Sequence, residues 1–254
     1  MTLPRTPSFR LDGRRALVTG AGRGIGLALA AALAEAGAQT VLVARSADEV
    51  AAAANAIRDA GGDATGVALD VTDVDAVRGF FDDRDTFHVL VNNAGTNRPM
   101  PMQQAEPEDF DAVLGLNLRS AFFVAQACAR RMIAEGIPGS LVHIGSQMGH
   151  VGGPNRSLYC ASKWGMEGMS KAFALDLAPH GIRSNVIAPT FIETPLTRPF
   201  FEDAAFRQSV LGKIKLGRIG RVEDLMGALL YLASDAASLV TGTSLVVDGG
   251  WTAE

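Results

Sequence analysis

The sequence predicts an α/β fold in which helices flank a doubly wound, seven-stranded parallel sheet. Short β-branched or apolar runs alternate with longer alanine-rich helical patterns from residue 15 almost to the C-terminus. This alternation is typical of parallel strands joined by crossover helices. Glycines also stand just past the end of four helical patterns, where a left-handed backbone ends a helix. These glycines are Gly37, Gly61, Gly136 and Gly181.

The strand candidates are mostly apolar throughout, as expected of strands that helices cover on both faces. In chain order they are Arg15 to Thr19, Thr40 to Ala44, Thr65 to Leu69, Val89 to Asn92, Ser140 to Ile144, Arg183 to Ala188 and Ser244 to Val247. The clearest segments with a helical pattern between them are Ile25 to Ala36, Asp48 to Ala60, Val74 to Asp82, Pro107 to Ala134, Tyr159 to Ala178 and Val222 to Ala233.

No repeat, low-complexity tract or Pro/Ser-rich linker divides the chain, so residues 1–254 are expected to form one domain. One segment, Thr190 to Lys215, is longer than an ordinary connection and carries Pro195, Pro199 and the adjacent Phe200 and Phe201. Segments of this length in a compact domain are usually lids or binding loops. A substrate lid is therefore expected over residues 190–215.

Composition and charge exclude several classes of function. The 254 residues are 48% apolar and 20% charged, with a net charge of −4, so no binding to nucleic acid or to an anionic membrane is expected. The longest stretch without a charged residue, Gly136 to Asn155, is broken by glycines and polar residues and predicts no membrane span. The first residues lack the apolar core of a secretory signal, which favours a cytoplasmic location.

Cysteine and histidine usage gives no sign of a metal site. Cys128 and Cys160 match no metal or redox spacing, and the four histidines form no cluster. Both cysteines are interpreted as small buried apolar residues in a reducing compartment.

A glycine-rich turn, Gly20-Ala21-Gly22-Arg23-Gly24-Ile25-Gly26, joins the first strand to the first helix. Gly20 permits the tight turn, Gly24 lets the backbone approach a pyrophosphate, and Gly26 lets the helix pack closely on the sheet. The free N–H groups at the helix start, together with its partial positive charge, then face the phosphates. A strand before and a helix after favour this dinucleotide site over a glycine turn without a ligand.

The end of the second strand indicates which dinucleotide is bound. An acid there normally binds the ribose 2′-hydroxyl, but this chain has Ala44 followed by Arg45. Arg45, helped by Arg23, is expected to bind a 2′-phosphate, which favours NADP over NAD. The alternative for Arg45 is a solvated surface charge. After the third strand, Asp70, with Val71 beside it, is placed to accept from the adenine amino group or, alternatively, to cap the next helix.

Tyr159 and Lys163 open a long helix and, four residues apart, lie on one face of it. Lowering the pKa of a phenol from ~10 to ~7 requires about 4 kcal/mol of preferential stabilisation of the phenolate. A neighbouring ammonium and a nicotinamide cation would supply it together. This geometry suits Tyr159 as a general acid/base with Lys163 as its partner, which would also hold the nicotinamide ribose. Taken alone, however, the spacing favours an ordinary helix face, because a Tyr and a Lys four residues apart occur by chance on any helix.

From Asp12 to Gly250 the sequence resembles the short-chain dehydrogenases/reductases. Thr19 to Gly26 is similar to the TGxxxGxG motif of that family, Asn92 to Gly95 to its NNAG, and Tyr159 to Lys163 to its YxxxK. Ser146 and Asn117 stand where the family keeps its catalytic serine and asparagine. The resemblance implies a single-domain Rossmann fold and hydride transfer between NAD(P) and a carbonyl or secondary alcohol.

The resemblance also implies individual roles. Ser146 would stabilise charge on the substrate oxygen, Tyr159 would exchange the proton, and Asn117 would hold a water that connects Lys163 to solvent. Further residues would contact the cofactor, and these are Asn93, Ala94, Gly95, Pro189, Ile192 and Thr194. The chain departs from the family at Thr190, where a glycine usually follows the proline, so a different backbone path into the lid is possible there.

Polar side chains around this site predict a polar or anionic substrate such as a sugar, sugar acid or polyol. The candidate substrate residues are Arg98, Gln147, His150, Asn155, Arg156 and Arg198. Each arginine also fits an ordinary surface charge. The alternative functions are a 3-oxoacyl thioester reductase, with Arg130 and Arg131 docking an acidic carrier, a non-catalytic NADP-binding scaffold, and a nucleotide-sugar epimerase or dehydratase.

Assembly is expected from the resemblance, because members of that family are mostly homotetramers or dimers. They are joined through two long helices, which correspond here to Pro107 to Ala134 and Tyr159 to Ala178. The apolar run Ala121 to Ala125 fits such an interface, and packing within one chain is the alternative.

Overall fold

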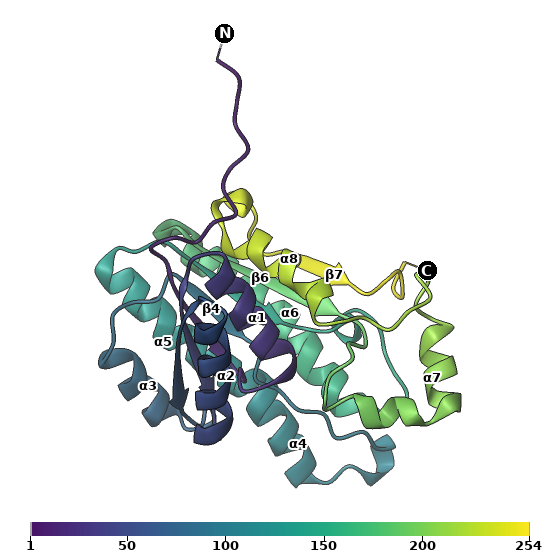
Figure 1. Cartoon of the computed structure of the whole chain (residues 1–254). Helices are drawn as coiled ribbons and strands as arrows, with labels where there is room; N and C mark the ends of the chain where they lie inside the picture. The colour runs from purple at the N-terminus through teal and green to yellow at the C-terminus, as the bar shows by residue number, and fades with distance from the viewer. Residues whose placement is uncertain (1, 254) are drawn as a thin grey trace.

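A computed structural model describes residues 2–253 and contains the predicted sheet of seven parallel strands (Figure 1). The strands are β1 (Arg15–Thr19), β2 (Gln39–Ala44), β3 (Asp63–Ala68), β4 (Val89–Asn92), β5 (Gly139–Ile144), β6 (Ile182–Pro189) and β7 (Ser244–Val247). Their order in space is β3-β2-β1-β4-β5-β6-β7. Strands β2 and β3 are added on one side of β1, and β4 to β7 are added on the other side, so the strand order reverses between β1 and β4. In this topology a ligand crevice opens at the carboxyl ends of those two strands.

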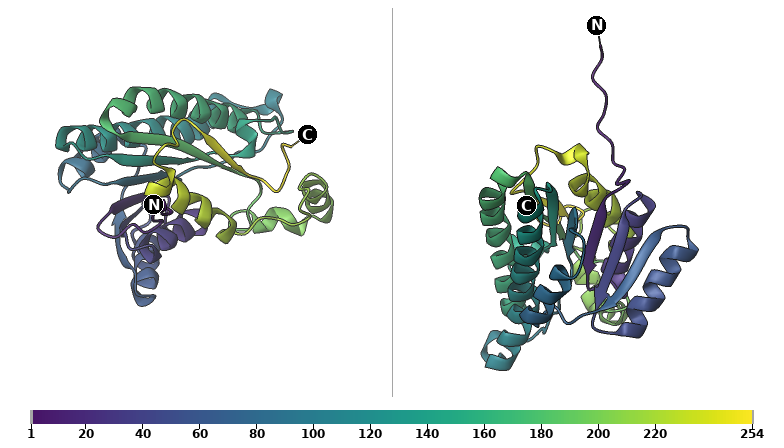
Figure 2. Two further views of the ribbon diagram at one scale, coloured as in Figure 1. Left: turned by 90° about the horizontal axis from the view of Figure 1, so that it is seen from above. Right: turned by 90° about the vertical axis from the view of Figure 1, so that its left-hand side faces the viewer.

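Helices cover both faces of the sheet (Figure 2). They are α1 (Gly24–Glu35), α2 (Ala47–Asp59), α3 (Val74–Asp82), α4 (Pro107–Leu114), α5 (Ser120–Glu135), α6 (Ser157–Leu177), α7 (Ala204–Leu211) and α8 (Glu223–Ala233). One face carries α1, α2 and α8, and the other carries α3, α5 and α6. The fold is therefore three layers, with the sheet in the middle.

Two hydrophobic clusters, one on each face, explain why the strands are apolar throughout. In β1, Ala16 and Val18 are buried against the layer of α1, whereas Leu17 is buried against the layer of α5. Successive side chains of a strand point to opposite faces, so a strand covered on both sides needs an apolar residue at every position.

The predicted helix from Pro107 to Ala134 is divided into α4 and α5 by one wide, π-helical turn, Gly115–Arg119. Asn117 lies in this turn and is completely buried. Its side chain accepts from the backbone N of Thr96 at 2.7 Å and donates to the backbone O of Thr96 at 2.9 Å. A buried amide needs partners, and the wider turn directs this one to the loop that follows β4.

The predicted lid is more ordered than a loop. After a bridge between Ile192 and Gly220, the chain forms a short 3₁₀ helix, Arg198–Glu202, and then α7, beyond the edge of the sheet (Figure 1). Asp203 caps α7 by accepting from the backbone N of the residues two and three positions further on. An aspartate before spaced apolar residues is a helix-start signal. Asp203 gives this signal for α7, so the helix could have been predicted from the sequence.

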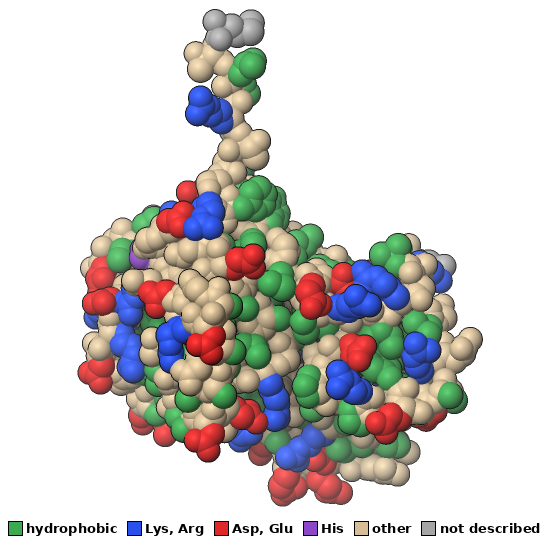
Figure 3. All heavy atoms as spheres, viewed as in Figure 1, with side chains coloured by type: hydrophobic (Ala, Val, Ile, Leu, Met, Phe, Trp, Pro, Cys, Tyr) green, Lys and Arg blue, Asp and Glu red, His purple; other side chains and the backbone are tan. Residues whose placement is uncertain are grey.

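Charges of both signs are interspersed over the face in Figure 3. Within residues 2–253, one helical run, Pro107–Glu135, has the length and composition to cross a membrane, but half of its apolar window is buried in this fold. A core helix passes the same test. In the same residues no group of three or more His, Cys, Asp or Glu side chains could hold a metal ion. Both cysteines are free, Cys128 buried and Cys160 partly exposed.

Candidate active site

A cavity of about 830 Å³ runs along the carboxyl ends of the strands. It begins at the glycine turn after β1, passes the segments that follow β2 to β5 and ends beneath the segment that follows β6. Every residue predicted to bind the cofactor lines it: Gly20, Arg23, Gly24, Ile25, Gly26, Arg45, Asp70, Val71, Asn93, Ala94, Gly95, Tyr159, Lys163, Pro189, Ile192 and Thr194. The fold thus brings together segments far apart in the sequence.

The glycine turn is shaped for close approach by a ligand. Gly20 and Gly24 have φ angles of 63° and 58°, which glycine adopts without strain. A Cβ at Gly26 would lie 2.5 Å from Nδ2 of Asn93, and that nitrogen braces the turn by donating to the backbone O of Thr19 at 2.9 Å. No side chain caps the start of α1, so its first N–H groups are available to a phosphate. These residues fit a dinucleotide.

Two arginines lie at the end of the cavity near β2, and within residues 2–253 only one of them is in an ion pair. Arg23 forms an ion pair with Glu49 at 2.8 Å, so its charge is already compensated. Arg45 is exposed and forms no ion pair within the described residues. Glu49 was not predicted as a site residue; its position in the first turn of the helix after Arg45 was the available signal. At this end of the cavity, Arg45 is therefore the arginine without an ion pair among the described residues, and its charge contributes to the lowered pKa of Asp70.

Asp70 lies at the same end of the cavity and stabilises the loop that follows β3. Its Oδ1 accepts from the backbone N of Thr72 at 2.9 Å and from the Thr72 hydroxyl at 2.8 Å. The backbone hydrogen bond is the main cause that lowers the pKa of Asp70. Asp73, not Asp70, caps α3, so the helix-cap alternative for Asp70 is wrong, because the chain needs three more residues to reach the start of α3.

Ser146, Tyr159 and Lys163 meet at the other end of the cavity. The Ser146 hydroxyl donates to Oε1 of Gln147 at 2.8 Å and interacts with the Tyr159 phenol. Lys163 is only 5% exposed. Its Nζ donates to the backbone O of Ile144 at 2.7 Å and lies 5.6 Å from the centre of the Tyr159 ring. A hydroxyl, a phenol and an ammonium thus share one wall.

The electrostatics of this trio differ from the prediction. Burial raises the pKa of Tyr159, and the Ser146 hydroxyl and then the Arg156 charge oppose that rise. The stabilisation of the phenolate was predicted to come from Lys163 together with the nicotinamide cation, so Arg156 is a contribution that the spacing of Tyr159 and Lys163 did not show. Burial lowers the pKa of Lys163 to about 8, and the charge of Glu167 opposes this.

Asn117 does not line the cavity but braces it. In addition to its two bonds with the loop after β4, its Nδ2 donates to Oγ of Ser162 at 3.0 Å, and that hydroxyl donates to the backbone O of Tyr159 at 2.7 Å. The side chain therefore fixes the start of α6. Only the second lone pair of Oδ1 remains for the predicted water.

Known proteins share this whole architecture. A family model described as enoyl-(acyl carrier protein) reductase matches residues 20–252. L-Xylulose reductase of Bos taurus is 37% identical over 245 residues, or 96% of this chain and 99% of its own. The 3-oxoacyl-[acyl-carrier-protein] reductase of Thermotoga maritima is 38% identical over 246 residues, or 95% of this chain and 99% of its own. This chain belongs to the short-chain dehydrogenase/reductase family.

A solved structure extends the likeness to three dimensions. Gluconate 5-dehydrogenase from Burkholderia cenocepacia, in complex with NADP and tartrate, superimposes with a TM-score of 0.93 at 42% identity and covers 97% of this chain and 98% of that one. This short-chain dehydrogenase is accordingly an oxidoreductase that acts on CH–OH groups.

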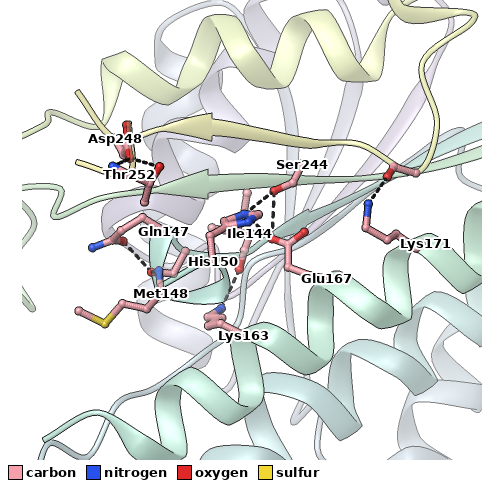
Figure 4. Close-up of polar contacts among 12 residues, drawn as sticks. Ile144, Gln147, Met148, His150, Lys163, Glu167, Lys171, Ser244, Asp248 and Thr252 are labelled. Carbon is pink, nitrogen blue, oxygen red and sulfur yellow. Dashed lines mark hydrogen bonds and ion pairs between the residues drawn. The ribbon is translucent and has the colours of Figure 1, made fainter. Parts of the chain in front are cut away.

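Beside Lys163, the dehydrogenase carries a polar network that joins α6 to β7 (Figure 4). Glu167, one turn after Lys163 and buried, accepts from the Ser244 hydroxyl at 3.0 Å and lies 3.2 Å from Nε2 of His150. The same nitrogen is 2.9 Å from the Ser244 hydroxyl. Burial raises the pKa of Glu167, and the Ser244 hydroxyl and the charge of His150 oppose it. His150, predicted to contact substrate, instead holds this carboxylate.

The other predicted substrate residues divide into two groups. Arg98, Gln147 and Arg156 line the cavity. Asn155 and Arg198 do not: Asn155 is a turn residue with φ of 59°, and Arg198 forms an ion pair with Glu193 at 3.4 Å. Loop residues were assigned to the site by their position after a strand, and that position does not reveal which way a side chain points.

Thr190, the departure from the family pattern, does not divert the chain. Its backbone N donates to the backbone O of Val247 at 3.2 Å, so the pairing of β6 with β7 continues past the strand end. Its hydroxyl is buried and is not paired with any described residue. Ile192 and Thr194 follow, both buried and both on the wall of the cavity.

Proposed function

We propose that this dehydrogenase interconverts a carbonyl and a secondary alcohol on a sugar, sugar acid or polyol, with NADP as coenzyme and Tyr159 as general acid/base. One observation carries the proposal: the Ser146–Tyr159–Lys163 group and the glycine turn line a single cavity. A proton-transfer group therefore lies beside a cradle for a dinucleotide. The relatives named as acting on xylulose and gluconate support the substrate class.

The residues of the chain account for the proton chemistry. Ser146 is placed to donate to the substrate oxygen, where charge develops during the reaction. Tyr159 gives its proton to that oxygen when a carbonyl is reduced and takes a proton from it when an alcohol is oxidised. Lys163, anchored on the backbone O of Ile144, holds a positive charge one helical turn from the phenol. Bound nicotinamide supplies or accepts the hydride.

Charge at the adenosine end supports NADP over NAD. A 2′-phosphate is bound best by an arginine that has no carboxylate partner. Arg45 forms no ion pair among residues 2–253, although its charge helps to lower the pKa of Asp70, whereas Arg23 is paired with Glu49.

The test is a substrate screen followed at the nicotinamide absorbance with each coenzyme, together with the variant Tyr159→Phe. Phenylalanine keeps the ring and removes the exchangeable proton, so kcat should fall about 10²- to 10⁴-fold while NADPH binding stays nearly unchanged. Tyr231→Phe is the matched control, since Tyr231 lies on α8 against Phe9. An unchanged kcat in Tyr159→Phe would contradict the assigned role.

Two outcomes of the screen would favour the alternative functions. The absence of turnover across a broad carbonyl and alcohol panel would favour a cofactor-binding scaffold. Product formed without a net change in coenzyme absorbance would favour an epimerase or dehydratase. The 3-oxoacyl reductase alternative has weaker support, because Arg131 is paired with Glu135 at 2.5 Å and leaves only Arg130 for an acidic carrier.

The assembly we infer is a homotetramer or dimer joined through α5 and α6, in the cytoplasm. Large apolar side chains on these helices are exposed, namely Phe122, Trp164 and Leu175. Exposed apolar residues of this size favour an interface between copies. Light scattering after size-exclusion chromatography tests the inference, and a monomer at micromolar concentration would overturn it.

A further inference from the structure

Four arginines line the cavity, and two of them form no ion pair among the described residues. Arg23 and Arg98 each form an ion pair at 2.8 Å with a carboxylate. Arg45 and Arg156 form none within residues 2–253. Arg45 is explained by the 2′-phosphate of NADP. Arg156, at the catalytic end, acts on the pKa of Tyr159 through its charge, but it takes no part in the transfer of the proton itself.

The surroundings of Arg156 make its isolation unusual. It immediately precedes α6, three residues before Tyr159, and it is partly buried. Within the part of the chain that the structure describes, its guanidinium makes a single, long hydrogen bond, 3.4 Å to the backbone O of Asn155. Burial lowers the pKa of Arg156. Taking a guanidinium out of water without a carboxylate partner costs free energy, so this cation lacks the partner that a purely structural arginine would have.

Among residues 2–253, no carboxylate on the cavity wall at this end balances the charge. The carboxylates on the cavity wall, among the described residues, are Glu49 and Asp70, and both lie at the adenosine end. The catalytic end instead adds the ammonium of Lys163. The phosphates of a dinucleotide belong at the glycine turn, so they do not reach Arg156 either. A negatively charged group on the substrate would supply the counter-ion that the cavity wall lacks here.

The backbone beside Arg156 favours an anion as well. No side chain caps the start of α6, a helix of 21 residues. The unpaired N–H groups of its first turn and its partial positive charge add to the charge of the guanidinium. Two independent features of the same corner thus attract negative charge.

We propose that Arg156 binds a carboxylate of the substrate, so that the substrate is a sugar acid rather than a neutral sugar or polyol. This inference rests on the proposed function and narrows it. A carboxylate matches the planar fork of one guanidinium with two parallel hydrogen bonds. A phosphate usually gathers several cations, and here the neighbouring Lys163 is already held by a backbone carbonyl. Arg98 is a poorer candidate because Asp109 compensates it.

The experiment compares kcat/KM, with NADP(H), for a keto sugar acid, a neutral ketose of the same chain length and a ketose phosphate. The wild type should favour the keto sugar acid. Arg156→Gln should lower kcat/KM for the acid about 10- to 100-fold, the loss expected for a hydrogen-bonded charge pair, and should lower it much less for the neutral ketose. Arg156→Lys should give a ratio of kcat/KM for the acid to kcat/KM for the neutral ketose between those of the wild type and Arg156→Gln. Lysine keeps the positive charge but cannot form the two parallel hydrogen bonds of a guanidinium.

Controls separate this inference from the proposed function. Arg130→Gln changes an exposed arginine on α5 and should leave the ratio of acid to neutral substrate unchanged. Calorimetric titration of the NADPH-loaded enzyme with gluconate measures binding without turnover. Arg156→Gln should weaken gluconate binding by a factor similar to its loss of kcat/KM for the acid.

Several results would overturn the assignment. The first is a ratio of kcat/KM for the acid to kcat/KM for the neutral ketose that is the same in Arg156→Gln as in the wild type. The second is a wild-type preference for the ketose phosphate. The third is a fall of that ratio in Arg98→Gln but not in Arg156→Gln. If the wild type turns over only the neutral ketose, this inference fails and the proposed function stands. If it turns over none of the three, the proposed function fails.

Discussion

Replacing Lys163 by methionine should change how the stability of the protein depends on pH. The ammonium is buried, and its pKa is about 8 in the folded chain against an ordinary value of 10.5. Methionine fills a similar volume and does not titrate. The difference between the two proteins therefore isolates the buried charge.

The sign and size follow from proton linkage. Between about pH 8 and pH 10.5 the unfolded chain holds the Lys163 proton and the folded chain does not, so this group makes stability rise with pH. The rise is about 1.4 kcal/mol per pH unit. From pH 8.5 to pH 10 the wild type should gain about 2 kcal/mol relative to Lys163→Met. Below about pH 8 both states are protonated, and the difference should become constant.

Urea unfolding of the coenzyme-free proteins at several pH values, followed by tryptophan fluorescence, measures this difference. Lys171→Met, an exposed lysine two turns further along α6, is the control and should follow the wild type. Stability curves of wild type and Lys163→Met that run parallel from pH 7.5 to pH 10 would refute the account of Lys163 as a buried ammonium with a lowered pKa.

Two further predictions concern the ends of the cavity. Arg45→Ala should weaken NADPH binding about 10- to 100-fold and NADH binding only slightly, because the lost contact is to the 2′-phosphate; equal losses in fluorescence titrations would mean that Arg45 does not bind that group. Glu167→Gln removes the carboxylate that opposes the lowered pKa of Lys163, so the alkaline limb of the kcat/KM profile should move to lower pH. Ser244→Ala keeps the carboxylate and should leave the alkaline limb at the pH of the wild type. If the alkaline limb lies at the same pH in Glu167→Gln and Ser244→Ala, the charge of Glu167 does not act on Lys163.

Features that act over a few residues were predictable from the sequence. The glycine turn places Gly20, Gly24 and Gly26 within one connection, and the pair Tyr159–Lys163 lies within one helical turn. The apolar runs of the strands were equally readable, because burial on both faces demands an apolar residue at every position. The predicted parallel sheet is confirmed.

Features that depend on distant partners were not predictable. The π turn at Asn117 exists because the amide reaches the loop after β4, and the sequence pattern of a continuous helix conceals it. His150 was assigned to substrate because it lies in the stretch after Ser146. Its partners are on other elements, Glu167 on α6 and Ser244 on β7, and the sequence does not show them. The pairing of Arg98 with Asp109 likewise joins a loop to α4.

The proposed carboxylate site has a consequence for the proton transfer that we propose for Tyr159. Arg156 is one of the two groups that oppose the rise in the pKa of the phenol. A carboxylate bound to Arg156 would compensate its charge, so the phenol would hold its proton more firmly in the complex than in the free enzyme. Reduction of a carbonyl needs Tyr159 protonated, and oxidation of an alcohol needs it as the base. A carboxylated substrate therefore favours the protonation state for reduction, and the oxidation of a sugar acid should need a higher pH than that of a neutral polyol in the same cavity.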